Sequence, residues 1–131
     1  MRKILIDTSA YSQLLRGSTE VLDELGRADL VYMSVFVLGE LHTGFKSGSQ
    51  EAQNRDRLER FLSRPTVRIF PATRETAEVF AAIKYALRKA DTPLPINDVW
   101  VAAHAIETGS VLVTFDSHFK EIRGLRLWDA F

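Results

Sequence analysis

Hydrophobic and polar positions follow two alternating patterns along the chain. Five short apolar runs predict strands, at residues 3–6, 30–33, 67–70, 111–114 and 125–128. Stretches with apolar residues at helical spacing predict helices at residues 8–16, 19–27, 35–45, 50–62, 74–90 and 96–107. Ser34 is a predicted helix cap, and Gly17 and Gly109 follow two of the helices. Strands that alternate with helices predict an α/β fold whose five-stranded, mostly parallel sheet is covered on both faces.

The length and composition narrow the class of protein. With 131 residues we expect a single domain over residues 1–131, and 46% hydrophobic with 26% charged residues excludes a disordered chain. The chain has no cysteine, which excludes disulfides, thiolate zinc sites and a cysteine nucleophile. Only three apolar residues follow the basic start before Asp7, so we expect no secretion signal, no membrane span and a cytoplasmic protein.

Four carboxylates occupy positions where chemistry is expected. Asp7 and Asp116 follow the first and fourth predicted strands, and parallel sheets bind ligands beyond the carboxyl ends of their strands. Glu40 and Asp98 lie on helices, three and four residues from apolar neighbours, which predicts that both sit on or beside buried stripes. Because a buried acid is costly unless it is paired or bound to a metal, the four predict one convergent site.

The neighbours of these acids in the sequence include no Lys or Arg that could neutralise them. A hard divalent cation, Mg²⁺ or Mn²⁺, suits an all-oxygen site and can cleave phosphodiesters by activating a water. The chain has 17 basic and 17 acidic side chains, a balance that does not favour a nucleic-acid partner. Without the four acids, however, 17 basic side chains face 13 acidic ones, and this surplus is compatible with a polyanion.

Each candidate residue also has a simpler interpretation. Asp7 and Asp98 are suitable helix caps, Asp116 a turn residue and Glu40 an exposed acid. For the three histidines, a surface or packing role is favoured over metal ligation; they are His42, His104 and His118. Two basic clusters could bind RNA or an acidic protein segment, or form salt-bridged surfaces; they comprise Arg57, Arg60, Arg64, Lys84, Arg88 and Lys89.

Four segments taken together resemble the PIN-domain ribonucleases, and the size resembles their VapC-type toxins. The segments are residues 6–9, 37–41, 97–105 and 112–116. The resemblance implies a three-layer α/β/α sandwich and a Mg²⁺- or Mn²⁺-dependent endoribonuclease with Asp7, Glu40, Asp98 and Asp116 as its acidic quartet. It implies that Thr114 helps to order the attacking water, and that the protein is a homodimer with a cognate antitoxin.

Three other functions are compatible with a chain of this length and pattern. A signalling receiver domain needs an acidic pair after the first strand, a phosphoacceptor aspartate after the third and a lysine after the fifth, and this chain has none of these. A phosphatase with an Asp-x-Asp nucleophile is excluded because residue 9 is Ser9. The remaining alternative is a PIN-like module that binds RNA or an antitoxin without cleaving.

Overall fold

All five strands of the sheet run parallel in the computed structural model, which describes residues 1–129. The strands are β1 (Lys3–Ile6), β2 (Leu30–Ser34), β3 (Val67–Phe70), β4 (Val111–Val113) and β5 (Arg126–Leu127). Their order across the sheet is β3-β2-β1-β4-β5. Along the chain, β2 and β3 therefore extend the sheet on one side of β1, and β4 and β5 then extend it on the other side, with β4 next to β1.

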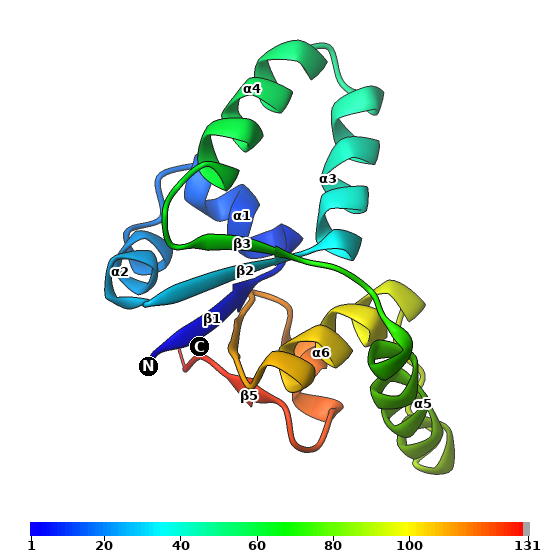
Figure 1. Cartoon of the computed structure of the whole chain (residues 1–131). Coiled ribbons are helices and arrows are strands. Elements are labelled where there is room, and N and C mark those ends of the chain that lie inside the picture. Colours follow the sequence, from blue (N-terminus) through cyan, green and yellow to red (C-terminus); the bar gives the residue numbers. More distant parts are fainter. Residues whose placement is uncertain (130–131) are drawn as a thin grey trace.

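Helices cover both faces of the sheet and complete three layers (Figure 1). The helices are α1 (Thr8–Leu15), α2 (Thr19–Arg27), α3 (Val35–Ser47), α4 (Glu51–Leu62), α5 (Arg74–Lys89) and α6 (Ile96–Thr108), with a short 3₁₀ helix η1 (Ser117–Glu121). In Figure 1, α1, α3 and α4 lie on one side of the sheet, and α5 and α6 lie on the other. This confirms the α/β/α sandwich.

Local sequence explains why these elements form. Ile4, Leu5 and Ile6 of β1 are all fully buried, as expected of a central strand covered on both faces. The Ser34 hydroxyl caps α3 by accepting from the Phe36 N–H at 3.1 Å. After α6, Gly109 adopts a left-handed conformation with φ of 68°, which glycine reaches without steric cost.

The last two strands are shorter than the apolar pattern predicts. Thr114 lies just beyond β4, because its side chain is engaged in hydrogen bonds that hold the following turn. At the edge of the sheet, β5 pairs with β4 alone and contains two residues. The Trp128 N–H continues the contact by donating to the Leu112 carbonyl at 3.1 Å.

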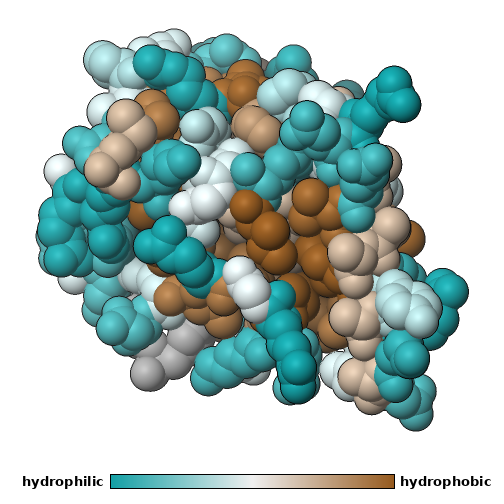
Figure 2. All heavy atoms as spheres, turned by 60° about the horizontal axis from the view of Figure 1, so that its bottom comes forward, coloured by the Kyte–Doolittle hydropathy of each residue, from teal (hydrophilic) through white to brown (hydrophobic). Residues whose placement is uncertain are grey.

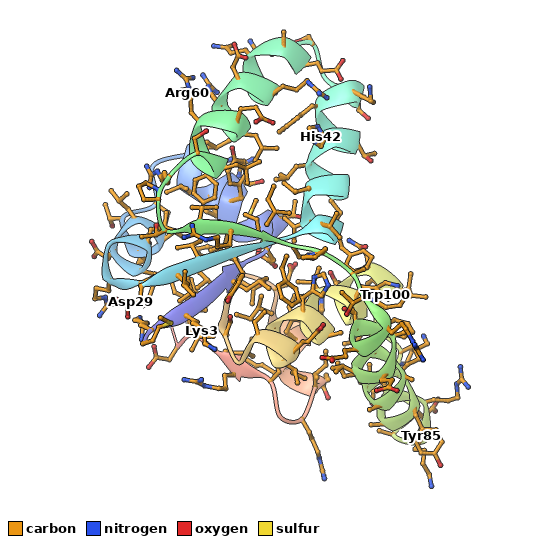
Figure 3. All side chains as sticks on the ribbon, in the orientation of Figure 1. Lys3, Asp29, His42, Arg60, Tyr85 and Trp100 are labelled. Atoms are coloured by element: carbon orange, nitrogen blue, oxygen red, sulfur yellow. The ribbon has the colours of Figure 1, made fainter. Side chains whose placement is uncertain are left out.

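An aromatic stack joins α3, α5 and α6. The Trp100 ring lies nearly parallel to Phe80 at 3.7 Å and to Phe36 at 5.1 Å between ring centroids. Phe45 and Phe61 are buried in the core. Phe36 and Phe80 pack against this core, whereas Tyr85 on α5 is 61% exposed (Figure 3).

The face formed by α5, α6 and η1 carries an apolar groove of about 610 Å³. Figure 2 views this side of the molecule and shows apolar side chains gathered there. Val79, Ile83, Ile106 and Ile122 contribute to the lining, whereas none of the four candidate acids does. In residues 1–129, no helix is both long and apolar enough to cross a membrane.

Candidate functional site

Two of the four acids lie at the carboxyl ends of β1 and β4, the neighbouring strands at which the strand order reverses. Asp7 follows β1 directly, and its N–H donates to the Val113 carbonyl at the end of β4 at 3.2 Å. Asp116 lies three residues beyond β4 and precedes η1. This is the place where open parallel sheets bind their ligands, as the sequence predicts.

Asp7 is 5% exposed and has hydrogen bonds to both carboxylate oxygens. Its Oδ1 accepts from the Ala10 N–H at 2.8 Å and from the Ser9 hydroxyl at 2.7 Å. Its Oδ2 accepts from the Thr114 hydroxyl at 2.5 Å. Asp7 is therefore both the cap of α1 and a member of the acidic site, so its two interpretations do not exclude each other.

The electrostatics of Asp7 favour an added positive charge. Burial raises the pKa of Asp7 above its ordinary value, and the negative charge of Asp116 adds to that rise. Hydrogen bonds from Thr114, Ala10 and Ser9 lower the same pKa but do not cancel the effect of burial. A cation beside Asp7 and Asp116 would relieve both the burial cost and the repulsion.

The Thr114 hydroxyl connects the two acids. It is fully buried, donates to Asp7 Oδ2 and accepts from the Asp116 N–H at 3.0 Å. The Ser9 hydroxyl makes a parallel link by accepting from the Phe115 N–H at 3.0 Å. The turn that carries Asp116 is therefore fastened to the start of α1 by two side-chain hydroxyls.

We expect Thr114→Val to destabilise the protein by about 1–3 kcal/mol, because it leaves the Asp116 N–H and Asp7 Oδ2 without the hydroxyl that joins them. Chemical denaturation in EDTA measures this loss. Thr114→Ser is the matched control, since it keeps the hydroxyl and removes only a methyl group. Equal unfolding midpoints for the valine variant and the parent protein would contradict the linking role.

Glu40 lies beside the buried stripe of α3 and is itself exposed. The buried positions of α3 are Val37, Leu41 and Phe45, whereas Glu40 is exposed. Each residue turns the helix by about 100°, which places Glu40 beside this stripe rather than on it, the second of the two predicted positions. Its Oε1 nevertheless accepts from the Thr8 hydroxyl at 2.8 Å, and this bond connects Glu40 to the residue after Asp7.

Asp98 lies in the first turn of α6, and its side chain is 18% exposed. Its Oδ2 accepts from Nε2 of His118 at 2.7 Å. The preference for a surface or packing role at His118 missed this contact. No local pattern in the sequence specifies this contact, because the two residues lie 20 positions apart.

The other two histidines have the packing roles expected of them. His104 is fully buried, and its Nδ1 lies 2.8 Å from the Ser34 hydroxyl, which caps α3. Burial lowers the pKa of His104 to about 4, so the ring is neutral near pH 7. His42 lies on α3 with its Nδ1 3.3 Å from Arg55, and Figure 3 shows it far along the helix from the sheet.

The donor set fits a hard divalent cation, although it does not form a closed cage. Among residues 1–129, no three histidine or carboxylate side chains are gathered tightly enough to hold a metal by themselves. Mg²⁺ needs no such cage, because it commonly uses one or two carboxylates and keeps several waters. Two hydrogen bonds occupy Asp7 Oδ1, so Oδ2 is the oxygen that Asp7 can offer.

The predicted basic residues do not converge on this site. Those on α4 are exposed and lie on one side of the sheet, whereas those on α5 lie on the other side (Figures 1 and 3). None of them belongs to an ion pair in the described part of the chain; the residues are Arg57 and Arg60 on α4, Arg64 just after it, and Lys84, Arg88 and Lys89 on α5. Their roles in binding RNA or an antitoxin stay predictions.

Comparisons with known proteins agree with this arrangement. The model of the PIN domain family matches residues 4–125. Ribonuclease VapC2 of Rickettsia felis is 31% identical over 111 residues, which cover 82% of this chain and 81% of the relative.

Solved structures share the fold over almost the whole chain. The DNA-bound VapBC of Salmonella typhimurium matches with a TM-score of 0.88 and 23% identity, over 98% of both chains. A member of the VapBC family of toxin-antitoxin systems from Mycobacterium tuberculosis, VapBC-5, matches with a TM-score of 0.75 and 24% identity, over 97% of this chain and 100% of the other. The family model and the relative agree with the position of Asp7 and Asp116 at the carboxyl ends of β1 and β4. The chain belongs to the PIN domain family.

Proposed function

We propose that this protein is a VapC-type toxin that hydrolyses RNA phosphodiester bonds with Mg²⁺ or Mn²⁺. The observation that carries the proposal is the buried Asp7 carboxylate, which Thr114 joins to Asp116 at the point where the strand order reverses. Such an acid is poorly placed for a purely structural role, because its burial and the nearby charge of Asp116 both disfavour its ionised form.

Asp7, Asp98, Asp116 and Glu40 would hold the cation. When bound, it supplies an activated water and stabilises the negative charge that develops on the phosphate. The chain itself keeps the acids in place: Thr114 and Ser9 orient Asp7, Thr8 orients Glu40, and His118 contacts Asp98. Without a cation, the acids would repel an RNA phosphate, so we expect catalysis to require the metal.

Further parts of the proposal draw on the relatives. The relative from Rickettsia felis is named a ribonuclease, and the neighbour from Mycobacterium tuberculosis belongs to a toxin-antitoxin system. Both support RNA as substrate and an antitoxin as partner for this chain. The apolar groove beside α5 is a surface that a homodimer could cover. The cytoplasm is the compartment in which such a toxin would meet its RNA.

The test is cleavage of structured and unstructured RNA by the purified protein. We expect cutting with Mn²⁺, none in EDTA, and recovery when Mn²⁺ is restored. Asp116→Asn should lower the rate by about a hundredfold or more, since it removes one charge from the site. Asp23→Asn on α2 makes the same chemical change at an exposed position outside the site and should keep the parent rate.

The alternative is a PIN-like module that binds RNA or an antitoxin without cleaving. RNA that stays intact under every metal condition, together with binding that Asp116→Asn does not change, would favour this alternative. Cutting that persists in EDTA would instead contradict the metal-dependent mechanism.

A further inference from the structure

We infer that His118 is a positioning residue, whose Nε2–H holds Asp98 in the orientation that binds the divalent cation. The inference rests on the proposed function and deepens it. The two side chains meet at 2.7 Å, and both are partly withdrawn from solvent, at 18% exposed for Asp98 and 35% for His118. The contact joins η1 to the first turn of α6.

The backbone fixes where His118 can lie. Its neighbour Phe119 is fully buried and anchors η1 in the core. The rings of His118 and Phe119 are in contact, with centroids 5.0 Å apart. The placement of the imidazole beside Asp98 is therefore supported by η1 as well as by the hydrogen bond itself.

One short segment thereby organises three of the four acids. Thr114 donates to Asp7, Asp116 is itself one of the acids, and His118 contacts Asp98. Glu40 is organised separately, by Thr8 at the start of α1. This segment therefore contains or contacts three of the four proposed ligands.

The chemistry of the contact decides what it does for a metal. An ionised carboxylate only accepts hydrogen bonds, so Nε2 carries the proton in this contact. With Oδ2 engaged by His118, Oδ1 of Asp98 is left for a cation. Hydrogen bonds to ligating carboxylates orient them, and the loss of such a partner typically weakens metal binding about 10–100-fold.

A competing interpretation is that His118 blocks the binding of the cation to Asp98. If the imidazole occupied the place of the cation, its removal would free Asp98 and tighten metal binding. The two roles therefore predict opposite changes in the Kd for Mn²⁺, and a binding measurement separates them without any assay of RNA cleavage.

Calorimetric titration of the purified protein with Mn²⁺ provides the test. We expect His118→Ala to weaken binding about tenfold or more. His118→Gln should restore it to within about threefold of the parent, because the glutamine Nε2 can donate from nearly the place of the imidazole Nε2. His118→Asn should fail to restore it, since its shorter amide does not reach Asp98.

His42→Gln is the matched control, since it removes an imidazole that bonds to Arg55 on α4 and contacts none of the four acids. Unfolding in EDTA shows whether each variant is folded, and should His118→Ala fail to fold, the Gln and Asn variants still decide the question. Unchanged or tighter Mn²⁺ binding by the alanine variant would overturn the inference. So would equal weakening by Gln and Asn, or a parent protein that does not bind Mn²⁺.

The outcomes also separate this inference from the proposed function. Mn²⁺ binding that depends on His118, in a protein that cuts no RNA, would support the positioning role and reject the nuclease. RNA cleavage with Mn²⁺ binding that does not depend on His118 would do the reverse.

Discussion

Replacing Asp7 by asparagine is expected to lower metal-dependent RNA cleavage about a thousandfold or more, while the metal-free protein becomes harder to unfold. Activity falls because the variant loses a charge from the centre of the acidic site. Stability rises because burial and the charge of Asp116 raise the pKa of Asp7, so its ionised form opposes folding near neutral pH.

The sign follows from linkage. A carboxyl whose folded-state pKa is raised binds its proton more tightly in the folded protein, so its contribution to stability is lost as pH rises from the ordinary value of 3.8 through the raised value. The cost of the ionised carboxyl in the parent protein is therefore greater at pH 7.5 than at pH 4. Asparagine has no such cost, and its Oδ1 can still accept from the Ala10 N–H.

Denaturant unfolding in EDTA at pH 7.5 checks the stability, and RNA cleavage with Mn²⁺ checks the activity. Asp7→Ala is the informative contrast, because it removes the charge and also the cap of α1, which is worth about 1 kcal/mol. It should be less stable than Asp7→Asn and equally inactive. A clear loss of stability in Asp7→Asn would show that the hydrogen bonds of the carboxylate outweigh the cost of its charge.

Acidification from pH 6.5 to pH 4 is expected to remove about 3 kcal/mol of stability through His104 alone. Burial lowers the pKa of His104 to about 4, whereas the ordinary value is 6.5. Between these values the unfolded chain binds a proton that the folded protein does not bind. Stability from the neutral ring is therefore complete above pH 6.5 and lost as pH falls toward 4.

The measurement is the free energy of unfolding at several pH values for the parent and for His104→Asn. Asparagine places an amide near the position of Nδ1, so it can keep the contact with Ser34 without titrating. We expect the variant to be less stable at pH 7, because the smaller side chain leaves space between Phe36 and Phe70, but to lose less on acidification. Parallel pH profiles for the two proteins would contradict the assignment to His104.

Much of the fold could be predicted from the sequence because the local signals agree with one another. The fully buried strands are continuous apolar runs, and helix caps such as Asp7 and Ser34 stand where the helices begin. Because parallel strands have their carboxyl ends at a common edge, Asp7 and Asp116 could be placed near one another without a structure. The length of the edge strand was predicted less well, because β5 contains only Arg126 and Leu127, whereas the pattern predicts residues 125–128.

The sequence was less informative about how each acid is held. Helical spacing shows which neighbours share the face of Glu40, but the boundary of the buried stripe depends on which helix packs against it. Asp98 and His118 lie 20 positions apart in the sequence and on two different elements, so no local pattern specifies their contact. Similarly, the hydroxyl of Thr114 reaches across 107 positions to Asp7. Such partners follow from tertiary structure.

The pairing of β1 with β4 has a consequence for the synthesis of the protein. The ribosome synthesises β1 and Asp7 first, but β4, Thr114 and Asp116 follow only after two further strands and six helices have been synthesised. Until then the first strand lacks a neighbour on one side, and Asp7 lacks both its hydroxyl partner and its companion acid. A nascent chain therefore has no complete acidic site until the segment that follows β4 has been synthesised and has folded against β1.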